Sequence, residues 1–327
     1  MTDDSPRRVD ADGDRGDRTD TVRGTRYHVV DVFTRGDDRY TGNQLGVFHD
    51  TADLSAADCL AITRETNFSE CTFVDGRSAG GFDVRIFDPV EEIPFAGHPT
   101  LGTAAVVREL VEQAGAAGAG ENVTLNLGVG PIDVWVERPD GDATAAGEAA
   151  EEHWMRQIPP EFGETVPADA IAPALGLDTD AVADGYPVQS VSTGLPTLVI
   201  PLASVAAVER ASTTRPAYDE VLDTYGDHNL LVVARGGVDG GDLHARVFAD
   251  YAGVPEDPAT GSAAGCLAGW LLEHEFLGDG PVAATVEQGY EMGRPSRLQL
   301  RAHRGDDGDP IVEVGGRAVP VAEGRLL

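Results

Sequence analysis

Residues 85–107 read RIFDPVEEIPFAGHPTLGTAAVV, and residues 246–272 read RVFADYAGVPEDPATGSAAGCLAGWLL. Both segments place Arg, an aliphatic residue and Phe in a strand pattern, and both continue into a loop that contains Pro94 or Pro255. Each loop leads into a helix pattern that is rich in small residues. Because the two segments repeat the same order of elements, they indicate an internal duplication.

The correspondence extends upstream at an offset of about 160 residues. The matched positions are Tyr27 with Tyr186, Gly42 before LGVF with Gly194 before TLVI, and TFV at Thr72 with LVV at Leu231. Several matches in one register are hard to ascribe to chance. The sequence therefore predicts two similar α/β lobes with a cleft between them, where ligand sites are commonly found.

The rest of the chain fills in these lobes. Strand patterns begin at Tyr27 and Leu45 and cover 70–74 and 82–87, and a helix capped by Asp53 or Ser55 runs toward Thr66. Gly/Ala-rich stretches at 113–121 and 141–152 predict loops, and GDDGDP at 305–310 predicts a turn. We expect a disordered tail over 1–25, an N-terminal lobe over 26–145, a C-terminal lobe over 146–316, and a last strand at about 317–327 that could pack on the N-terminal lobe.

The charge balance is strongly acidic. The 327 residues include 56 acidic and 24 basic residues, which gives a formal net charge of −32. Such a surface repels nucleic acid and anionic membranes, so we expect neither as a partner. It fits a halophilic protein, because a Debye length of about 3 Å at 1 M salt screens the self-repulsion. An acidic protein of an ordinary cytosol is the alternative.

Two further observations concern location. The chain has no run of about 20 apolar residues that could span a membrane. No apolar run follows Arg7 and Arg8, so a secretory or twin-arginine signal is not indicated. We therefore expect a cytoplasmic protein.

The residue types that are missing exclude several chemistries. All basic residues are Arg, and the absence of Lys removes Schiff-base catalysis, pyridoxal-phosphate anchoring, P-loops and Ser–Lys dyads. Cys59, Cys71 and Cys266 form no C-x-x-C pair, so neither a zinc site nor a disulfide framework is indicated. Each Cys is expected to be a small buried hydrophobic residue.

The two loop-to-helix junctions are candidate binding segments. Pro99 suits a first helical turn, and Asp257 could cap a helix that begins at Pro258. Two helix N-termini that face one cleft would present free N–H groups to an anion, for which a carboxylate substrate is the obvious candidate. The alternative is two tight turns that merely require small residues. The matched pair favours a functional interpretation.

Three titratable residues accompany these junctions. Glu70 stands just before an apolar strand, and His98 and Asp257 lie inside the two junctions. A carboxylic acid in a cleft can have its pKa raised toward neutrality by desolvation and then exchange protons with a carbon acid. The alternatives are structural: Glu70 could pair at a strand edge, His98 could be a hydrogen-bonded core residue, and Asp257 could be an N-cap.

Five blocks of sequence, in this order, resemble the PhzF family of phenazine biosynthesis-like isomerases: GNQLGVF at Gly42, TNFSECTFV at Thr66, FDPVEEIPFAGHPTLGTA at Phe87, EDPATGSAAG at Glu256 and EQGYEMGRPS at Glu287. The resemblance implies the α+β fold of the diaminopimelate epimerase-like superfamily, in which two pseudo-symmetric lobes each wrap a sheet or barrel around a central helix. It also implies a homodimer that needs no cofactor. The sequence contains no plausible cluster of metal ligands, so we expect no metal.

The resemblance assigns roles to individual residues. Glu70 corresponds to the general acid/base of the family, which removes a proton from one substrate carbon and returns it to another. His98 and Asp257 correspond to residues that assist protonation and orient the substrate. The implied substrate-binding residues are Asn43, Gly97, Thr260, Gly261 and Ser262.

These observations predict an isomerase that moves a proton within a small carboxylate-bearing substrate. One alternative is an amino-acid or hydroxy-acid epimerase or racemase. The related two-cysteine enzymes have one Cys at each junction, whereas 96–100 and 257–262 contain none, and this disfavours their mechanism. The other alternative is a non-catalytic protein that binds carboxylates.

The acidic surface generates a first testable prediction. The midpoint of thermal unfolding should rise as KCl is added, because salt screens the repulsion among charges that sum to −32. Circular dichroism melts measure this, and sucrose serves as the control because it is excluded from the protein surface but screens no charge. A midpoint that rises no more in KCl than in sucrose contradicts the prediction.

Overall fold

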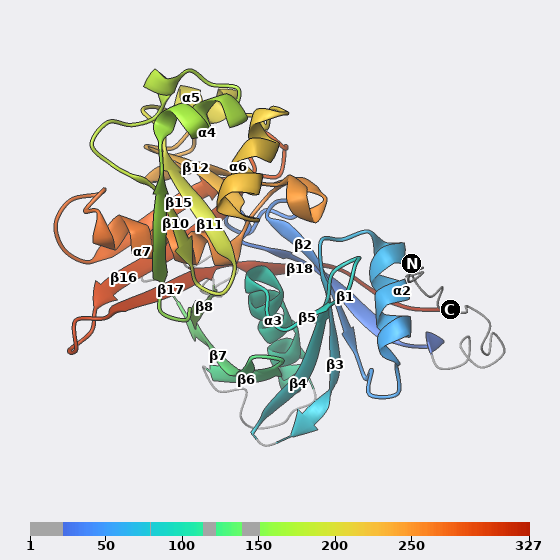
Figure 1. Ribbon diagram of the computed structural model, residues 1–327. Helices are drawn as coiled ribbons and strands as arrows, with labels where there is room; N and C mark the ends of the chain where they lie inside the picture. The colour runs from blue at the N-terminus through green and yellow to red at the C-terminus, as the bar shows by residue number, and fades with distance from the viewer. Residues whose placement is uncertain (1–21, 79, 114–121, 139–150) are drawn as a thin grey trace, which may run out of the picture.

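The computed structural model describes residues 22–78, 80–113, 122–138 and 151–327. Its strands join into one 18-stranded mixed sheet that curves around two central helices (Figure 1). The strands are β1 Arg26–Val32, β2 Asn43–His49, β3 Cys71–Ser78, β4 Gly81–Phe87, β5 Glu92–Ile93, β6 Asn122–Leu127, β7 Gly130–Glu137, β8 Glu152–Arg156, β9 Glu161–Val166, β10 Val188–Ser192, β11 Pro196–Pro201, β12 Asn229–Arg235, β13 Leu243–Ala249, β14 Val254–Asp257, β15 Val282–Gln288, β16 Ser296–Arg304, β17 Pro310–Gly316 and β18 Ala318–Arg325. The helices are α2 Ala56–Thr66, α3 Gly97–Gln113, α4 Ala168–Ala174, α5 Val205–Arg210, α6 Ala217–Tyr225 and α7 Gly261–Glu273, with short 3₁₀ turns η1 Thr179–Ala181 and η2 Asp250–Ala252.

The strand pairing repeats along the chain, with β1–β8 matched by β10–β17. The parallel pairs β2–β3 and β4–β6 recur as β11–β12 and β13–β15. The outer strand β18 pairs with β1 just as β9 pairs with β10, and the two halves join where β8 pairs with β17. This pairing confirms the duplication that the sequence predicts.

The matched arginines Arg85 and Arg246 both bind a carboxylate, although the two carboxylates lie on β3 and β14, which do not correspond in the repeat. Arg85 on β4 donates two hydrogen bonds to the Asp75 carboxylate, at 2.8 and 2.9 Å. Arg246 on β13 donates two hydrogen bonds to the Glu256 carboxylate, both at 2.8 Å. Both pairs are partly buried, where a two-point Arg–carboxylate contact is stronger than an exposed ion pair. Each pair therefore fixes the strand that leads toward a central helix.

Most strands begin within two residues of their predicted starts, and the 305–310 turn does connect β16 to β17. Ser55, and not Asp53, caps α2: its side chain accepts from the Asp58 N–H, and Asp58 returns the contact in a capping box. Residues 114–121 of one predicted loop, and the boundary between lobes at 145–146, lie outside the described residues.

Two predictions about local structure are wrong. Asp257 does not cap a helix at Pro258, because α7 begins at Gly261 and the Asp257 side chain turns toward other partners.

The predicted tail over 1–25 is too long at its C-terminal end. Gly24 donates to the Leu326 carbonyl and Leu326 donates to the Thr25 carbonyl, so these residues pack beside the end of β18. Residues 1–21 lie outside the described part of the chain.

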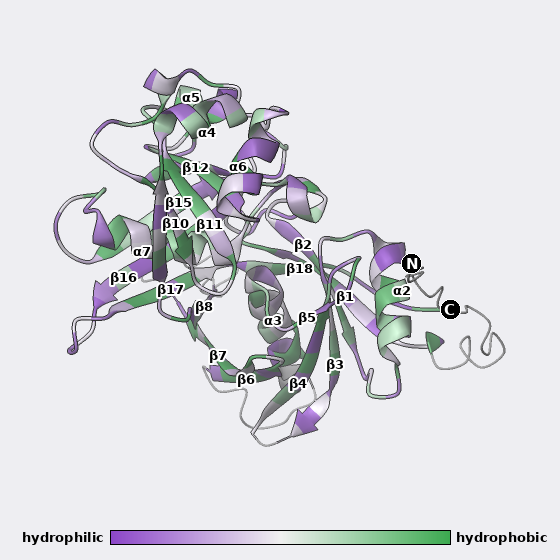
Figure 2. Cartoon of the chain, viewed as in Figure 1, coloured by the Kyte–Doolittle hydropathy of each residue, from purple (hydrophilic) through white to green (hydrophobic). Residues whose placement is uncertain are grey.

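The core is built around α3 and α7. Helix α3 packs against β1, β2, β6 and β8, and α7 packs against β10, β11, β16 and β17. All residues from Gly261 to Leu272 are buried, which explains why α7 combines Gly and Ala with Leu and Trp and has no polar face. Helices α4, α5 and α6 cover the outer side of β10–β12, where hydrophobic residues predominate on β12 (Figure 2), and α2 packs in a smaller cluster with residues of β2, β3 and β4. Within the described residues, no helix is long and apolar enough to cross a membrane.

A buried ion pair links the two halves. Arg294, in the loop between β15 and β16, donates to Asp31 of β1 at 2.8 Å and to the carbonyls of Thr41 and Gly42. The Asp31 side chain is 1% exposed, and its second oxygen accepts from the Tyr40 N–H at 2.6 Å. This contact fixes the loop before β2, and Asn43 is the first residue of that strand.

We predict that Asp31→Asn destabilises the protein by roughly 3 kcal/mol or more, because it leaves the Arg294 charge without its buried counterion. Urea unfolding in concentrated salt measures the change. The control is Glu273→Gln, which breaks the exposed Arg304–Glu273 pair and should cost less than about 1 kcal/mol. If both variants lost the same free energy of unfolding, the buried pair would contribute no more to stability than the exposed pair.

Candidate active site

A cavity of about 470 Å³ lies at the N-terminal ends of the two central helices. It receives polar side chains from both halves of the chain. Those include Ser69, Glu70 and His98 from the first half and Thr193, Asn229, Tyr251, Asp257, Thr260 and Ser262 from the second. Apolar residues form much of the remaining wall: Ile93, Phe95, Val129, Ile158, Leu195 and Val254. The cavity has the size and the lining of a small-molecule site.

The two junctions predicted from the sequence touch at the floor of this cavity. A Cβ atom on Gly97 would lie 2.9 Å from Gly261 Cα and from the Ser262 nitrogen. A Cβ on Gly261 would lie 3.2 Å from Gly97 Cα. Only glycine permits this approach. It brings the first turns of two helices of more than ten residues, with their unpaired N–H groups and positive dipole ends, to one point.

Asp257 sits at the end of β14 and is held from both halves. Its Oδ1 accepts from Asn43 Nδ2 at 2.9 Å, and its Oδ2 accepts from the Thr260 hydroxyl at 2.5 Å. Asn43 also donates to the Ala259 carbonyl at 2.9 Å and lies 3.4 Å from His98 Nδ1. Asn43 is not among the residues that line the cavity. It is buried and connects Asp257 with His98.

Glu70 approaches the Nε2 atom of the His98 ring, whereas Asn43 approaches the Nδ1 atom. The Glu70 Oε2 atom is 3.7 Å from His98 Nε2, and the Glu70 side chain is 22% exposed. Both atoms are buried, and neither has a hydrogen-bond partner among the described residues. Buried polar atoms are normally paired, so these two are arranged to meet a polar group from the cavity.

Burial shifts the pKa of each of the three titratable groups. Desolvation, together with the negative charge of Asp88, raises the pKa of Glu70 to about 7. Desolvation and the charge of Glu70 raise the pKa of Asp257 to about 6, although the Thr260 and Asn43 contacts oppose this. Desolvation lowers the pKa of His98 to about 4. At neutral pH the site thus holds a neutral imidazole between two acids that exchange protons near physiological pH.

The structure places all eight predicted site residues at or directly behind this cavity. Sequence reasoning missed Gln288, which hydrogen-bonds the segment from Asp257 to Thr260, and Thr193, whose hydroxyl donates to the Ser262 carbonyl at 3.2 Å. Signals for both were present. Gln288 belongs to the block EQGYEMGRPS, and Thr193 precedes the Gly194 that matches Gly42.

The second cavity and the three cysteines add no functional group to this site. A second cavity of about 330 Å³, lined by residues such as Arg26, His28 and His49, contains none of the predicted site residues. All three cysteines are buried, and none is among the residues that line the larger cavity. Burial raises the pKa of Cys71, which follows Glu70, to about 11. In the part of the chain that the structure describes, no group of three or more His, Cys, Asp or Glu is arranged to hold a metal ion.

The raised pKa of Glu70 predicts a pH-dependent cost of folding. The folded pKa is about 7, above the unfolded value near 4.3, so the stability contributed by Glu70 is complete below about pH 4 and is lost as pH rises through 7. Glu70→Gln stays neutral, so its stability relative to the wild type should increase between about pH 5 and 8, by on the order of 3 kcal/mol. Chemical denaturation at several pH values measures the difference. The exposed control Glu161→Gln should show no such trend. A stability difference between Glu70→Gln and the wild type that stays constant with pH would contradict the assigned burial of Glu70.

The sequence is similar to those of known isomerases over most of its length. The family model described as phenazine biosynthesis-like protein matches residues 30–324. An uncharacterized isomerase of Mesorhizobium japonicum is 35% identical over 308 residues, which are 92% of this chain and 98% of the relative. A trans-2,3-dihydro-3-hydroxyanthranilate isomerase of Pseudomonas aeruginosa is 35% identical over 303 residues, with 92% and 98% of the two chains covered.

Solved structures agree on the fold. A PhzF-family phenazine biosynthesis protein of Bacillus anthracis has a TM-score of 0.82 at 24% identity, with 93% of this chain and 99% of the other covered. A probable proline racemase of Agrobacterium radiobacter has a TM-score of 0.58 at 10% identity, with 93% of each chain covered, and so shares the fold alone. The predicted α+β fold of two pseudo-symmetric halves is confirmed. The chain belongs to the PhzF family of phenazine biosynthesis-like isomerases.

Proposed function

We propose that the protein moves a proton between two carbons of a small carboxylate-bearing substrate, with Glu70 as the general acid/base. The observation that carries the proposal is the position of Glu70. Its Oε2 atom is buried at the cavity, 3.7 Å from His98 Nε2, without a hydrogen-bond partner among the described residues. A carboxyl oxygen that is buried but unpaired is free to receive a proton from a bound molecule.

The pKa of Glu70 suits this role. A group with a pKa of about 7 is present in both protonation states at neutral pH, so the same side chain can act first as base and then as acid. In the proposed reaction the Glu70 carboxylate takes a proton from a substrate C–H bond, and the electron pair of that bond delocalises into the substrate π system. Glu70 then returns the proton to a second carbon. The atoms balance with no oxidant or added group.

The touching helix ends supply the proposed binding site for the substrate carboxylate. Gly97, Gly261 and Ser262, in the first turns of α3 and α7, line the cavity beside Asp257. Helix N-termini favour anions because their N–H groups are unpaired and the helix dipoles add positive potential. Thr260 and Asn43 would hold Asp257 in position, and Asp257 with His98 would orient the reacting group.

The alternatives have less support. A two-thiol racemase needs reactive cysteines at the cavity, whereas the three cysteines are buried and burial raises the pKa of both Cys71 and Cys266. A protein that only binds carboxylates has no need for a buried Glu70 with a pKa near neutrality. Following the family resemblance and the net charge of −32, we further propose a homodimer that works in a salt-rich cytoplasm.

Deuterium incorporation tests the proposed reaction. We expect the protein, in deuterated water and concentrated salt, to place deuterium on a carbon of trans-2,3-dihydro-3-hydroxyanthranilate or of another small cyclic or amino-acid carboxylate in a screen. Glu70→Gln should reduce the exchange by at least about a thousandfold, since the general acid/base is removed. Mass spectrometry and proton NMR follow the label.

The matched control is Glu152→Gln. Burial also raises the pKa of Glu152, but this residue lies on β8 and does not line the cavity, so exchange should persist. The carboxamide analogue of an active substrate should react poorly, because it has no charge for the helix ends. Exchange that survives in Glu70→Gln would remove Glu70 from the mechanism, and binding without exchange in the wild type would favour the non-catalytic alternative.

A further inference from the structure

Gln288 is the last residue of β15 and is 2% exposed. Its side-chain amide makes three hydrogen bonds, all to the segment from Asp257 to Thr260. The Nε2 group donates to the Asp257 carbonyl at 2.7 Å and to the Thr260 hydroxyl at 3.1 Å, and the Oε1 atom accepts from the Thr260 N–H at 3.3 Å. Every hydrogen of this amide is therefore used.

The backbone partners fix which way the amide points. The Thr260 N–H can only donate, so it selects the oxygen of Gln288, and the Asp257 carbonyl can only accept, so it selects the nitrogen. A flipped amide would lose both contacts. The second N–H of Gln288 is thereby aimed at the Thr260 hydroxyl.

This direction determines where the Thr260 proton goes. A hydroxyl has one hydrogen to donate, and Thr260 Oγ1, which accepts from Gln288, donates to Asp257 Oδ2 at 2.5 Å. Thr260 is the N-cap of α7, where a hydroxyl normally accepts from a helix N–H, but its side chain makes no such bond. The hydroxyl is directed to Asp257 instead, and the first N–H groups of α7 stay available at the cavity.

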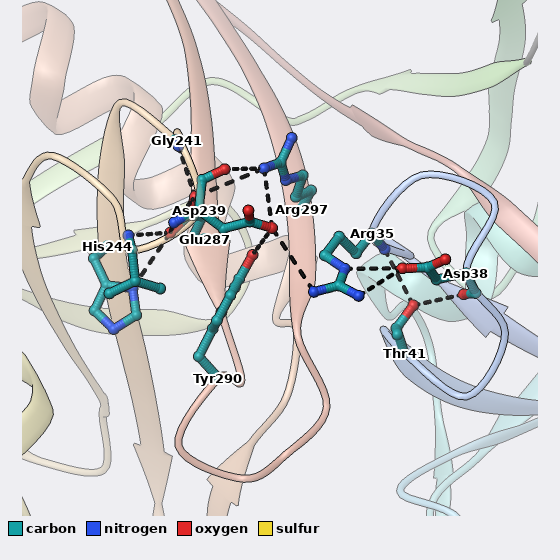
Figure 3. A network of polar contacts seen from close by, with 10 residues as sticks. Arg35, Asp38, Thr41, Asp239, Gly241, His244, Glu287, Tyr290 and Arg297 are labelled. Atoms are coloured by element: carbon teal, nitrogen blue, oxygen red, sulfur yellow. Dashed lines mark hydrogen bonds and ion pairs between the residues drawn. The ribbon is translucent and has the colours of Figure 1, made fainter.

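A separate set of contacts anchors Gln288. Successive strand residues point to opposite sides, and the preceding Glu287 extends away from Gln288 into the loop between β12 and β13. Its fully buried carboxylate accepts from the N–H groups of Val238, Asp239 and Gly241. Arg297, Asp239 and Arg35 continue the network toward the loop after β1 (Figure 3). The end of β15 is thus held rigidly on one side while Gln288 reaches to the other.

We propose that Gln288 is a positioning residue that acts through Thr260: it aims the Thr260 hydroxyl at Asp257 and thereby holds the Asp257 carboxylate in its ionised form and in a fixed orientation beside the cavity. The role of Asp257 in turnover rests on the proposed function, but the hydrogen-bond relay does not.

The relay opposes the effects of burial and of Glu70 on Asp257 and acts in the same direction as the remaining groups around it. Glu70, ahead of β3, disfavours the ionised form of Asp257, and His98 on α3 favours it, as do the hydrogen bonds from Asn43 on β2 and from Thr260. Neighbouring charges have their own partners: Glu256 pairs with Arg246 on β13, and Glu291 pairs with His244 and approaches Arg246. Removing the Thr260 contact therefore should raise the pKa of Asp257.

The experiment titrates Asp257 directly by ¹³C NMR of protein labelled at the Asp side-chain carboxyl carbons, with Asp257→Asn to assign the signal. We expect Thr260→Val and Gln288→Leu each to move the midpoint upward by about one pH unit, since each removes a hydrogen bond to the charged group or its support. Thr260→Ser keeps the hydroxyl and should leave the midpoint in place. The double variant Thr260→Val/Gln288→Leu should move it no further than Thr260→Val alone, because Gln288 acts through Thr260.

A midpoint that is unchanged in Gln288→Leu while Thr260→Val shifts it would overturn the relay, as would equal shifts in Thr260→Ser and Thr260→Val. If Gln288→Leu does not fold, Gln288→Asn provides the same test, because it keeps an amide that is one methylene too short. No substrate is needed, so the titration stands even if the proposed reaction fails. Where deuterium exchange is observed, the midpoint of its pH dependence should move to higher pH in the same variants. A merely structural loss would instead lower the exchange rate equally at every pH.

Discussion

The contact between Gly97 and Gly261 is the constraint on which the site depends. Because neither residue has a side chain, α3 and α7 meet end to end, and the cavity inherits two sets of free N–H groups at one point. The acidic and basic groups then come from the segments that flank this contact. Glu70 and His98 arrive with the first half, Asp257 and Thr260 with the second, and Asn43 reaches across from β2. A duplicated fold therefore gives a site that is not itself symmetric.

Desolvation is the common cause of the unusual acid–base properties of the site. It raises the pKa values of Glu70 and Asp257 and lowers that of His98. Hydrogen bonds from Asn43 and Thr260 counter this effect at Asp257, and Ser69 counters it at Glu70, whose Oε2 atom has no hydrogen-bond partner among the described residues. The two carboxyl groups of one cavity thus differ in their neighbours, and Asp257 has the lower pKa, about 6 against about 7 for Glu70.

Much of this arrangement could be predicted from the sequence, because strand and helix patterns repeat in register. The repeat at Arg85 and Arg246 located both junctions, and these lie at one cavity as expected, although the direct contact of Gly97 with Gly261 was not predicted. What failed was local and depended on tertiary partners. An Asp just before a Pro looks like an N-cap, but Asp257 is drawn away by Asn43, which is remote in sequence. Gln288 was overlooked because a buried amide carries no pattern of its own until its partners are known.

The order of the strands has a consequence for synthesis of the chain. The first half is closed by β18 on β1 and is joined through β17 to β8, and both of these strands are encoded at the end of the sequence. While the ribosome is still translating the second half, the nascent first half presents unpaired strand edges at β1 and β8. Such edges invite mispairing between polypeptides on neighbouring ribosomes. Only the synthesis of β17 and β18 covers these edges, so the first half reaches its final pairing late in translation.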